Sequence, residues 1–303
     1  MSRNVLADEA QLVLESVCER LGLDARGATL LRVRGNVVFK LRTPIVVRVA
    51  MSADAASRMP PVLAITRWLA AQGFPTIHPA DEVGEQPVTH DGRTITFWRY
   101  VPPGATPATT AELGTVLRDL HARDVPAIPL QTLTDPLRSI RTTVQRKPDI
   151  LTAEQQAWLA DRIAVLTECW HDLAFSLPPS LLHGDPWIDN LWRTEQGDVV
   201  LGDWDHVAIG PREWDLIHTY HGHRRFGLNQ QDVDDFARAY GYDLRDWSGY
   251  ETLMQIRDLY AVAVHIRNAP NDPFSGDELP RRLQSLMQGE AWTRWHLAPV
   301  PEN

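Results

Sequence analysis

Cysteines, lysines and long apolar stretches are all scarce in this chain of 303 residues. The two cysteines, Cys18 and Cys169, are too few for a disulfide framework or a zinc site, and their helically spaced apolar surroundings predict two buried free thiols. No apolar run reaches the roughly 18 residues that a membrane span needs. Residues 1–10 carry acids and no apolar core, unlike a signal peptide. These absences make the cytoplasm the expected location and argue against a membrane partner.

Basic runs are absent as well. Only Lys40 and Lys147 are lysines, and the formal net charge is −9, so we expect no nucleic-acid partner. The negative charge favours solubility, and attraction of cationic substrates is the functional alternative. With 44% apolar and 23% charged residues of both signs, the composition is that of a folded globular protein rather than a disordered one.

The order of the predicted elements changes near residue 102. Short strands dominate before Pro102-Pro103-Gly104, and helices dominate after it, apart from one β-rich stretch at residues 181–204. The pattern predicts helices at 7–21, 62–72, 110–122, 152–175, 229–241, 250–268 and 278–292, and strands at 29–34, 36–42, 45–50, 85–90 and 94–101. We therefore predict an α+β fold of two lobes, residues 1–101 and 102–303, with a ligand site between them.

One stretch combines residue types that suit phosphoryl transfer to an alcohol. It contains His183-Gly184-Asp185, then Asn190, and then Asp203 at the end of an apolar strand. The reaction needs a group that takes the hydroxyl proton and orients the hydroxyl, and Mg²⁺ to neutralise the phosphates. A carboxylate on a loop, Asp185, suits the first role. The oxygens of Asn190 and Asp203 suit Mg²⁺, which prefers hard ligands.

This spacing resembles the aminoglycoside phosphotransferase and choline kinase superfamily, a branch of the protein-kinase-like fold. The signature of that family is an HGDxxxxN loop followed by a strand that ends in Asp. The resemblance implies a bilobal enzyme that uses ATP and Mg²⁺, with Asp185 as the catalytic base and with Asn190 and Asp203 as metal ligands. It also implies that His183 packs inside the loop, and that Asp215 caps a helix and braces the loop.

The nucleotide is expected in the first lobe. Gly35 and Asn36 lie between two predicted strands, where backbone N–H groups could face phosphate. The resemblance places a cation on the third strand, where Arg48 interrupts an apolar run and its guanidinium suits phosphate oxygens. A solvent-facing arginine is the alternative. After the last strand, the Tyr100 carbonyl and the Val101 N–H are the expected contacts to adenine.

Related kinases have a helical glutamate that pairs with this cation, and this sequence lacks it. The corresponding residues 59–65 read Met-Pro-Pro-Val-Leu-Ala-Ile and hold no acid. An arginine stays protonated without such a partner. The missing glutamate therefore affects the orientation of Arg48 and not its charge. It supports a rival interpretation, a nucleotide-binding pseudokinase with a regulatory or scaffolding role. The intact Asp185, Asn190 and Asp203 favour an active enzyme.

The expected acceptor is a hydroxyl of a small molecule, either an aminoglycoside-type antibiotic or another amine-bearing or hydroxylated metabolite. Choline, homoserine and sugar kinases are alternatives, whereas residues 203–215 leave no room for the activation segment of a protein kinase. Six acids of the second lobe could bind a cationic acceptor: Asp205, Glu213, Asp232, Asp234, Asp235 and Glu251. The acceptor itself, ATP against GTP, and a monomeric or dimeric state stay open.

Histidines and tryptophans gather near the catalytic motif. His206, His218, His221 and His223 lack a matching carboxylate pattern, so we do not expect zinc, and the 218/221 spacing suggests a surface helix. Trp187 is expected to be a core residue, with stacking on a ring-shaped substrate as the alternative.

Overall fold

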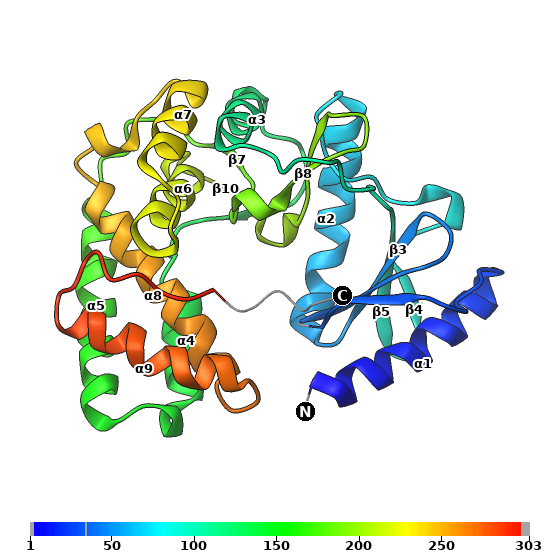
Figure 1. Cartoon of the computed structure of the whole chain (residues 1–303), viewed down its shortest axis with the longest axis horizontal. Coiled ribbons are helices and arrows are strands. Elements are labelled where there is room, and N and C mark those ends of the chain that lie inside the picture. Colours follow the sequence, from blue (N-terminus) through cyan, green and yellow to red (C-terminus); the bar gives the residue numbers. More distant parts are fainter. Residues whose placement is uncertain (1–2, 34, 298–303) are drawn as a thin grey trace.

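The computed structural model describes residues 3–33 and 35–297, and two lobes are evident (Figure 1). The first lobe is built on an antiparallel sheet in the order β1-β2-β3-β5-β4. Its strands are β1 (Thr29–Val33), β2 (Asn36–Lys40), β3 (Ile45–Ala50), β5 (Arg93–Arg99) and β4 (Val88–His90). The protein-kinase-like α+β fold that the sequence predicted is confirmed.

Strand alternation divides the first lobe into two packing layers. Val47 and Val49 of β3 face a core that they share with α1 (Arg3–Leu21), while Ala50 packs on the other side against α2 (Ala53–Ala71). Arg48 lies between Val47 and Val49 and therefore shares the α2 side of the sheet with Ala50.

Helix α2 begins nine residues before the predicted start at residue 62. The hydroxyl of Ser52 accepts a hydrogen bond from the Ala55 N–H and caps the helix there, and the helix continues through Pro60-Pro61. The predicted helix started only after these prolines, but the tertiary contacts of the apolar face of α2 keep the helix intact through them.

The second lobe is mainly helical. The predicted helices are present as α3 (Thr110–Ala122), α5 (Ala153–Asp172), α7 (Gln230–Tyr240), α8 (Tyr250–Asn268) and α9 (Pro273–Met287). Two further helices, α4 (Arg138–Arg146) and α6 (Glu213–Phe226), were not placed by apolar periodicity. Helix α6 is deeply buried, with twelve of its fourteen residues inaccessible, so the surface helix expected for His218 and His221 is wrong.

Short strands and 3₁₀ turns frame the catalytic loop. Strand β7 (Ser180–Leu182) enters the loop, and the hairpin of β8 (Leu191–Arg193) and β9 (Val199–Leu201) follows it. Strand β10 (Ala208–Gly210) pairs with both β7 and β6 (Gln131–Thr132). The 3₁₀ turns are η1 (Asp81–Val83), η2 (Pro148–Ile150), η3 (Ile188–Asn190), η4 (Trp204–His206) and η5 (Leu244–Asp246).

The two lobes share a core. Figure 1 shows α2 between the five-stranded sheet and the second lobe, and apolar side chains of α2 belong to the same buried cluster as those of α3, α6 and α8. The main chain adds two bonds near β9, from Ile77 N–H to the Leu201 carbonyl (3.2 Å) and from Leu201 N–H to the Pro75 carbonyl (2.9 Å). Among the residues described, no helix is long and apolar enough to cross a membrane.

Candidate active site

The catalytic loop, residues 183–190, is held by main-chain and side-chain bonds on both sides. His183 contacts the Gly202 carbonyl through Nε2 (2.7 Å), and the Asp215 carboxylate accepts the N–H groups of His183 (2.7 Å) and Gly184 (2.8 Å). Gly184 has a φ of 88°, and a Cβ there would collide with the His206 carbonyl, so only glycine fits. The expected bracing roles of His183 and Asp215 are therefore confirmed.

The expected helix-capping role of Asp215 is wrong. Helix α6 has Arg212 at its N-cap position, and Asp215 occupies the third residue of the helix. From there its carboxylate points back to the loop and also meets Nε2 of His121 on α3 (3.1 Å). Asp215 thus links α3, α6 and the catalytic loop.

Asp185, the predicted catalytic residue, is gripped through one oxygen. Its Oδ1 lies 3.1 Å from Nε2 of His218 and 3.3 Å from a terminal nitrogen of Arg257, and 32% of its side chain is exposed. Desolvation raises the pKa of the Asp185 carboxyl, but the hydrogen bond from His218 and the charge of Arg257 outweigh it and hold the pKa below its usual range. Asp185 is therefore ionised at neutral pH, with Oδ1 restrained.

Arg257 reaches Asp185 from α8 through an aromatic enclosure. Its side chain lies over the rings of Trp187, Trp214 and Tyr260, with 5.7, 5.7 and 5.1 Å from the guanidinium carbon to the ring centroids. Arg257 is only 6% exposed. Such cation–π contacts hold a buried guanidinium in place. This use of Trp187 and Trp214 around a protein cation was not anticipated.

His218 completes the grip on Asp185 from α6. Desolvation and the nearby charge of Arg257 lower the pKa of His218, and Nε2 of the ring lies where it can donate to the Asp185 carboxylate. The ring is fully buried, which fixes its direction. His218 and Arg257 together position the carboxylate from two different helices.

The expected metal ligands lie on adjacent backbone. The Gly202 N–H donates to the Asn190 carbonyl (2.9 Å), which places Asp203 beside Asn190. The Asn190 amide nitrogen donates to the Asp185 carbonyl (2.9 Å), which leaves its carboxamide oxygen for a metal. Asp203 sits in the left-handed region (φ 59°) and presents a partly exposed carboxylate. One carboxylate and one carboxamide oxygen form a hard donor set that fits Mg²⁺.

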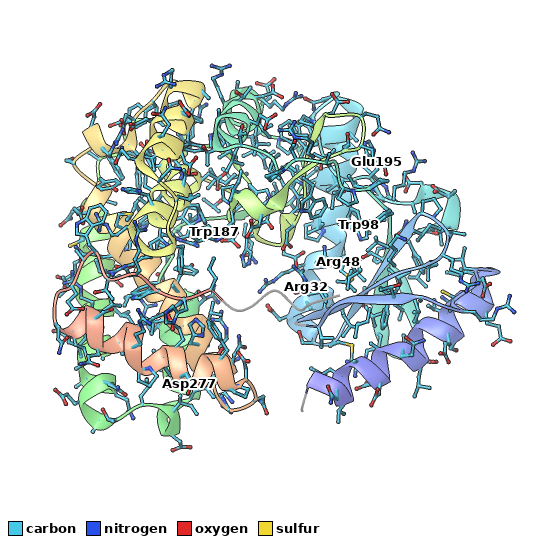
Figure 2. All side chains as sticks on the ribbon, in the orientation of Figure 1. Arg32, Arg48, Trp98, Trp187, Glu195 and Asp277 are labelled. Atoms are coloured by element: carbon cyan, nitrogen blue, oxygen red, sulfur yellow. The ribbon has the colours of Figure 1, made fainter. Side chains whose placement is uncertain are left out.

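Arg48 has an unexpected partner. A single terminal nitrogen of its guanidinium lies 2.8 and 2.7 Å from the two carboxylate oxygens of Asp205, and Arg48 is only 8% exposed, so it is not a solvent-facing arginine. Arg32 of β1 donates from one terminal nitrogen to a single carboxylate oxygen of Asp203 (3.1 Å). Figure 2 shows Arg32 and Arg48 on the first lobe facing the junction, with Trp187 on the second lobe.

The other expected nucleotide residues lie at the ends of strands of the five-stranded sheet. Gly35 forms an exposed bend, and Asn36, 6% exposed, directs its amide nitrogen to Asp205 (3.3 Å). Tyr100 and Val101 follow β5 directly. Within the described residues, the Tyr100 carbonyl and the Val101 N–H have no hydrogen-bond partner, so both could meet a base. Their roles remain predictions.

The six acids considered for a cationic acceptor are already engaged. Asp205 pairs with Arg48, Glu213 accepts two main-chain N–H groups, and Asp232 belongs to the cap of α7. The remaining three pair with arginines, namely Asp234 with Arg245, Asp235 with Arg238, and Glu251 with Arg224. These acids therefore give no support to a polyamine acceptor.

Sequence reasoning missed Arg32, His218 and Arg257 as parts of the site. Arg257 and Asp258 stand at positions of α8 where the helical period calls for apolar residues, and this was the available signal. Arg32 and His218 carried no comparable signal, because their partners lie 171 and 33 residues away.

Solved structures of similar fold include an amicoumacin kinase (12% identity, TM-score 0.68, 96% of this chain and 98% of that one) and a choline kinase from Streptococcus pneumoniae (15%, 0.67, 93% and 98%). An aminoglycoside phosphotransferase from Streptomyces rimosus is similar too (20%, 0.64, 83% and 97%). No curated protein sequence matches significantly. The sequence model of the phosphotransferase enzyme family, however, matches residues 30–253. The chain therefore belongs to the phosphotransferase enzyme family.

Proposed function

We propose that this enzyme transfers the γ-phosphate of ATP to a hydroxyl of a small molecule, with Asp185 as the catalytic base that accepts the hydroxyl proton. The observation that carries this proposal is the grip on one oxygen of Asp185 by His218 and Arg257, on a loop that also brings Asn190 and Asp203 together. These contacts hold the charged Asp185 carboxylate in a fixed direction. Positioning of this kind accounts for most of the catalysis in phosphoryl transfer.

The chain's own groups divide the work between the lobes. Residues 1–101 would bind the nucleotide, with Arg48 and the main chain near Gly35 and Asn36 at the phosphates and with Tyr100 and Val101 at the base. Residues 102–303 would bind the acceptor, whose hydroxyl donates to the Asp185 carboxylate. Mg²⁺ held by Asn190 and Asp203 would neutralise phosphate charge when bound. The amicoumacin kinase of similar fold was solved in complex with AMP-PNP, Ca²⁺ and Ami, which supports a site for a nucleotide, a divalent cation and a small molecule.

The acceptor class is an antibiotic of the aminoglycoside type or another hydroxylated metabolite, as in the similar structures. Structures of similar fold hold ADP with spectinomycin and GDP with kanamycin, so both nucleotides belong in the test. The acids of the second lobe are engaged by the chain's own groups. The test should therefore include neutral hydroxylated compounds as well as polyamines.

The test is nucleotide consumption with a panel of aminoglycosides, other hydroxylated antibiotics, amino alcohols and sugars. Each reaction is run with ATP or GTP, and with Mg²⁺ present or chelated. We expect turnover that depends on one acceptor class and on Mg²⁺, and transfer confirmed by mass spectrometry of the product. Nucleotide binding without transfer to any acceptor would contradict the proposal and favour the pseudokinase.

A further inference from the structure

The nucleotide-side cation is aimed by the opposite lobe. We propose that Asp205 is the positioning residue of Arg48 and takes the part that a helical glutamate plays in related kinases. This inference rests on the proposed function, because it concerns how the phosphates of ATP are gripped. Both carboxylate oxygens of Asp205 lie within 2.8 Å of one terminal nitrogen of Arg48.

The contact restrains one part of the guanidinium and leaves another free. Within the described residues, the second terminal nitrogen of Arg48 has no hydrogen-bond partner, and its Nε is buried without one. A guanidinium is planar, so fixing one nitrogen by two short bonds limits the directions in which the others can point. Arg48 therefore keeps donors for a phosphate oxygen while its orientation is set by Asp205.

Asp205 is held firmly at this place by its neighbours. Trp204 is fully buried, with its ring centroid 6.0 Å from that of Phe74 and 4.7 Å from that of His183. Two main-chain bonds join Leu201 of β9 to the segment that follows α2. The turn that carries Asp205 is thus anchored to the first lobe although it belongs to the second. A rigid carboxylate can aim its partner, whereas a flexible one cannot.

Helix α2 offers no substitute for Asp205. Its face toward the end of β3 is formed by Ala55 and Met59, which pack with Ala50 in a small apolar cluster. An acid on that face would need its own partners to stay buried. Asp205 instead receives a second donor, the amide nitrogen of Asn36 at 3.3 Å. The missing helical acid is thereby replaced by one that lies 157 residues from Arg48 in sequence.

The experiment measures binding of Mg·AMP-PNP by calorimetry to the wild type, Asp205→Asn, Arg48→Ala and the double variant. AMP-PNP needs no acceptor, so the result is independent of whether a substrate is known. We expect Asp205→Asn to weaken binding about 10-fold or more, as for loss of a charged hydrogen bond, and to have little further effect when Arg48 is already alanine. Asp81→Asn, which removes an exposed carboxylate paired with Arg67, is the matched control and should bind normally.

Several outcomes would overturn the inference. Unchanged binding of Mg·AMP-PNP by Asp205→Asn would show that the Asp205–Arg48 contact does not contribute to nucleotide binding. Tighter binding would show that the contact opposes it. An equal loss in both Arg48 backgrounds would show that Asp205 acts independently, and a loss that disappears at high Mg²⁺ would make it a metal ligand. If Asp205→Asn does not fold, Asp205→Glu replaces it in the same cycle, because it keeps the charge but displaces it. Normal AMP-PNP binding without phosphotransfer would defeat only the proposed function, whereas no binding by the wild type would defeat both.

Discussion

The acceptor side and the nucleotide side of the proposed active site are built differently. On the acceptor side, Asp185 is held by His218 and Arg257, which belong to the same lobe. On the nucleotide side, Arg48 of the first lobe is held by Asp205 of the second. The acceptor side therefore keeps its geometry as long as one lobe is folded, while the nucleotide side also depends on how the lobes are placed. Variants on the two sides should separate turnover from nucleotide affinity.

The largest effect is expected on the acceptor side, from Asp185→Asn. The asparagine keeps the shape but cannot take a proton, and general-base catalysis contributes about 10²- to 10⁴-fold. We expect turnover to fall at least 100-fold while the affinity for Mg·ATP stays near normal. The measurement is steady-state kinetics on the identified acceptor, together with nucleotide titration. Asp189→Asn in the same loop is exposed and should behave as wild type. Equal turnover by Asp185→Asn and wild type would remove Asp185 from the mechanism.

The next effect tests the nucleotide side directly through Arg48→Ala. Loss of a charged hydrogen bond costs about 1.5–3 kcal/mol, or roughly 10- to 150-fold in affinity. We expect this rise in the KM for ATP, with a smaller change in the KM for the acceptor. Arg67→Ala, which removes an exposed arginine of the same lobe, is the control. An unchanged KM for ATP would mean that Lys40 or the main chain binds the phosphates.

A smaller effect on rate is expected from Arg257→Met. One of two groups that restrain Asp185 is lost while His218 remains, so we expect kcat to fall about 10-fold. The KM for ATP should not change, because Arg257 contacts the acceptor side alone. Arg257→Lys should recover part of kcat, which a purely structural role would not produce. Arg267→Met alters an exposed arginine of the same helix and should leave kcat unchanged. A change confined to the KM for ATP would break the separation between the two sides.

Acid should weaken the scaffold behind the acceptor side, through stability rather than rate. Desolvation lowers the pKa of His221 to about 4, and the described residues offer no partner for its buried Nδ1. Between its ordinary pKa of about 6.5 and pH 4, the unfolded chain binds a proton that the folded chain does not. The free energy of unfolding should therefore fall with falling pH by up to about 1.4 kcal/mol per pH unit.

The matched variant for this pH effect is His221→Gln, which keeps a donor for Asp258 but does not titrate. Denaturant unfolding between pH 7 and pH 4 should show a shallower pH dependence for His221→Gln than for wild type. The exposed His78→Gln should retain the wild-type slope. Parallel curves for wild type and His221→Gln would show that His221 is not the residue responsible.

Local patterns predicted most elements, and they failed where burial is polar. Helices α3 and α8 were placed residue for residue, because their apolar positions repeat at the helical period. Apolar periodicity did not place helix α6, because Asp215, His218 and Arg225 stand among its buried apolar residues and break the pattern. The first half of α2 was not predicted, because it precedes Pro60-Pro61 in the sequence. In the structure, a serine cap and tertiary packing support this half of the helix. Buried polar residues do not stand out as an apolar repeat in the sequence. A helix that buries them is therefore located only when the residues that pair with them are known.

The sequence by itself predicted the candidate catalytic segment, because Asp185, Asn190 and Asp203 lie close together along the chain. It also determined which face of β3 carries Arg48, through strand alternation. Only the tertiary structure decided that Asp205 would replace the missing helical acid, that Arg32 would meet Asp203, and that Arg257 would restrain Asp185. These contacts join residues 157, 171 and 72 positions apart. No local propensity encodes such distances, which the packing of the elements and the two lobes determines.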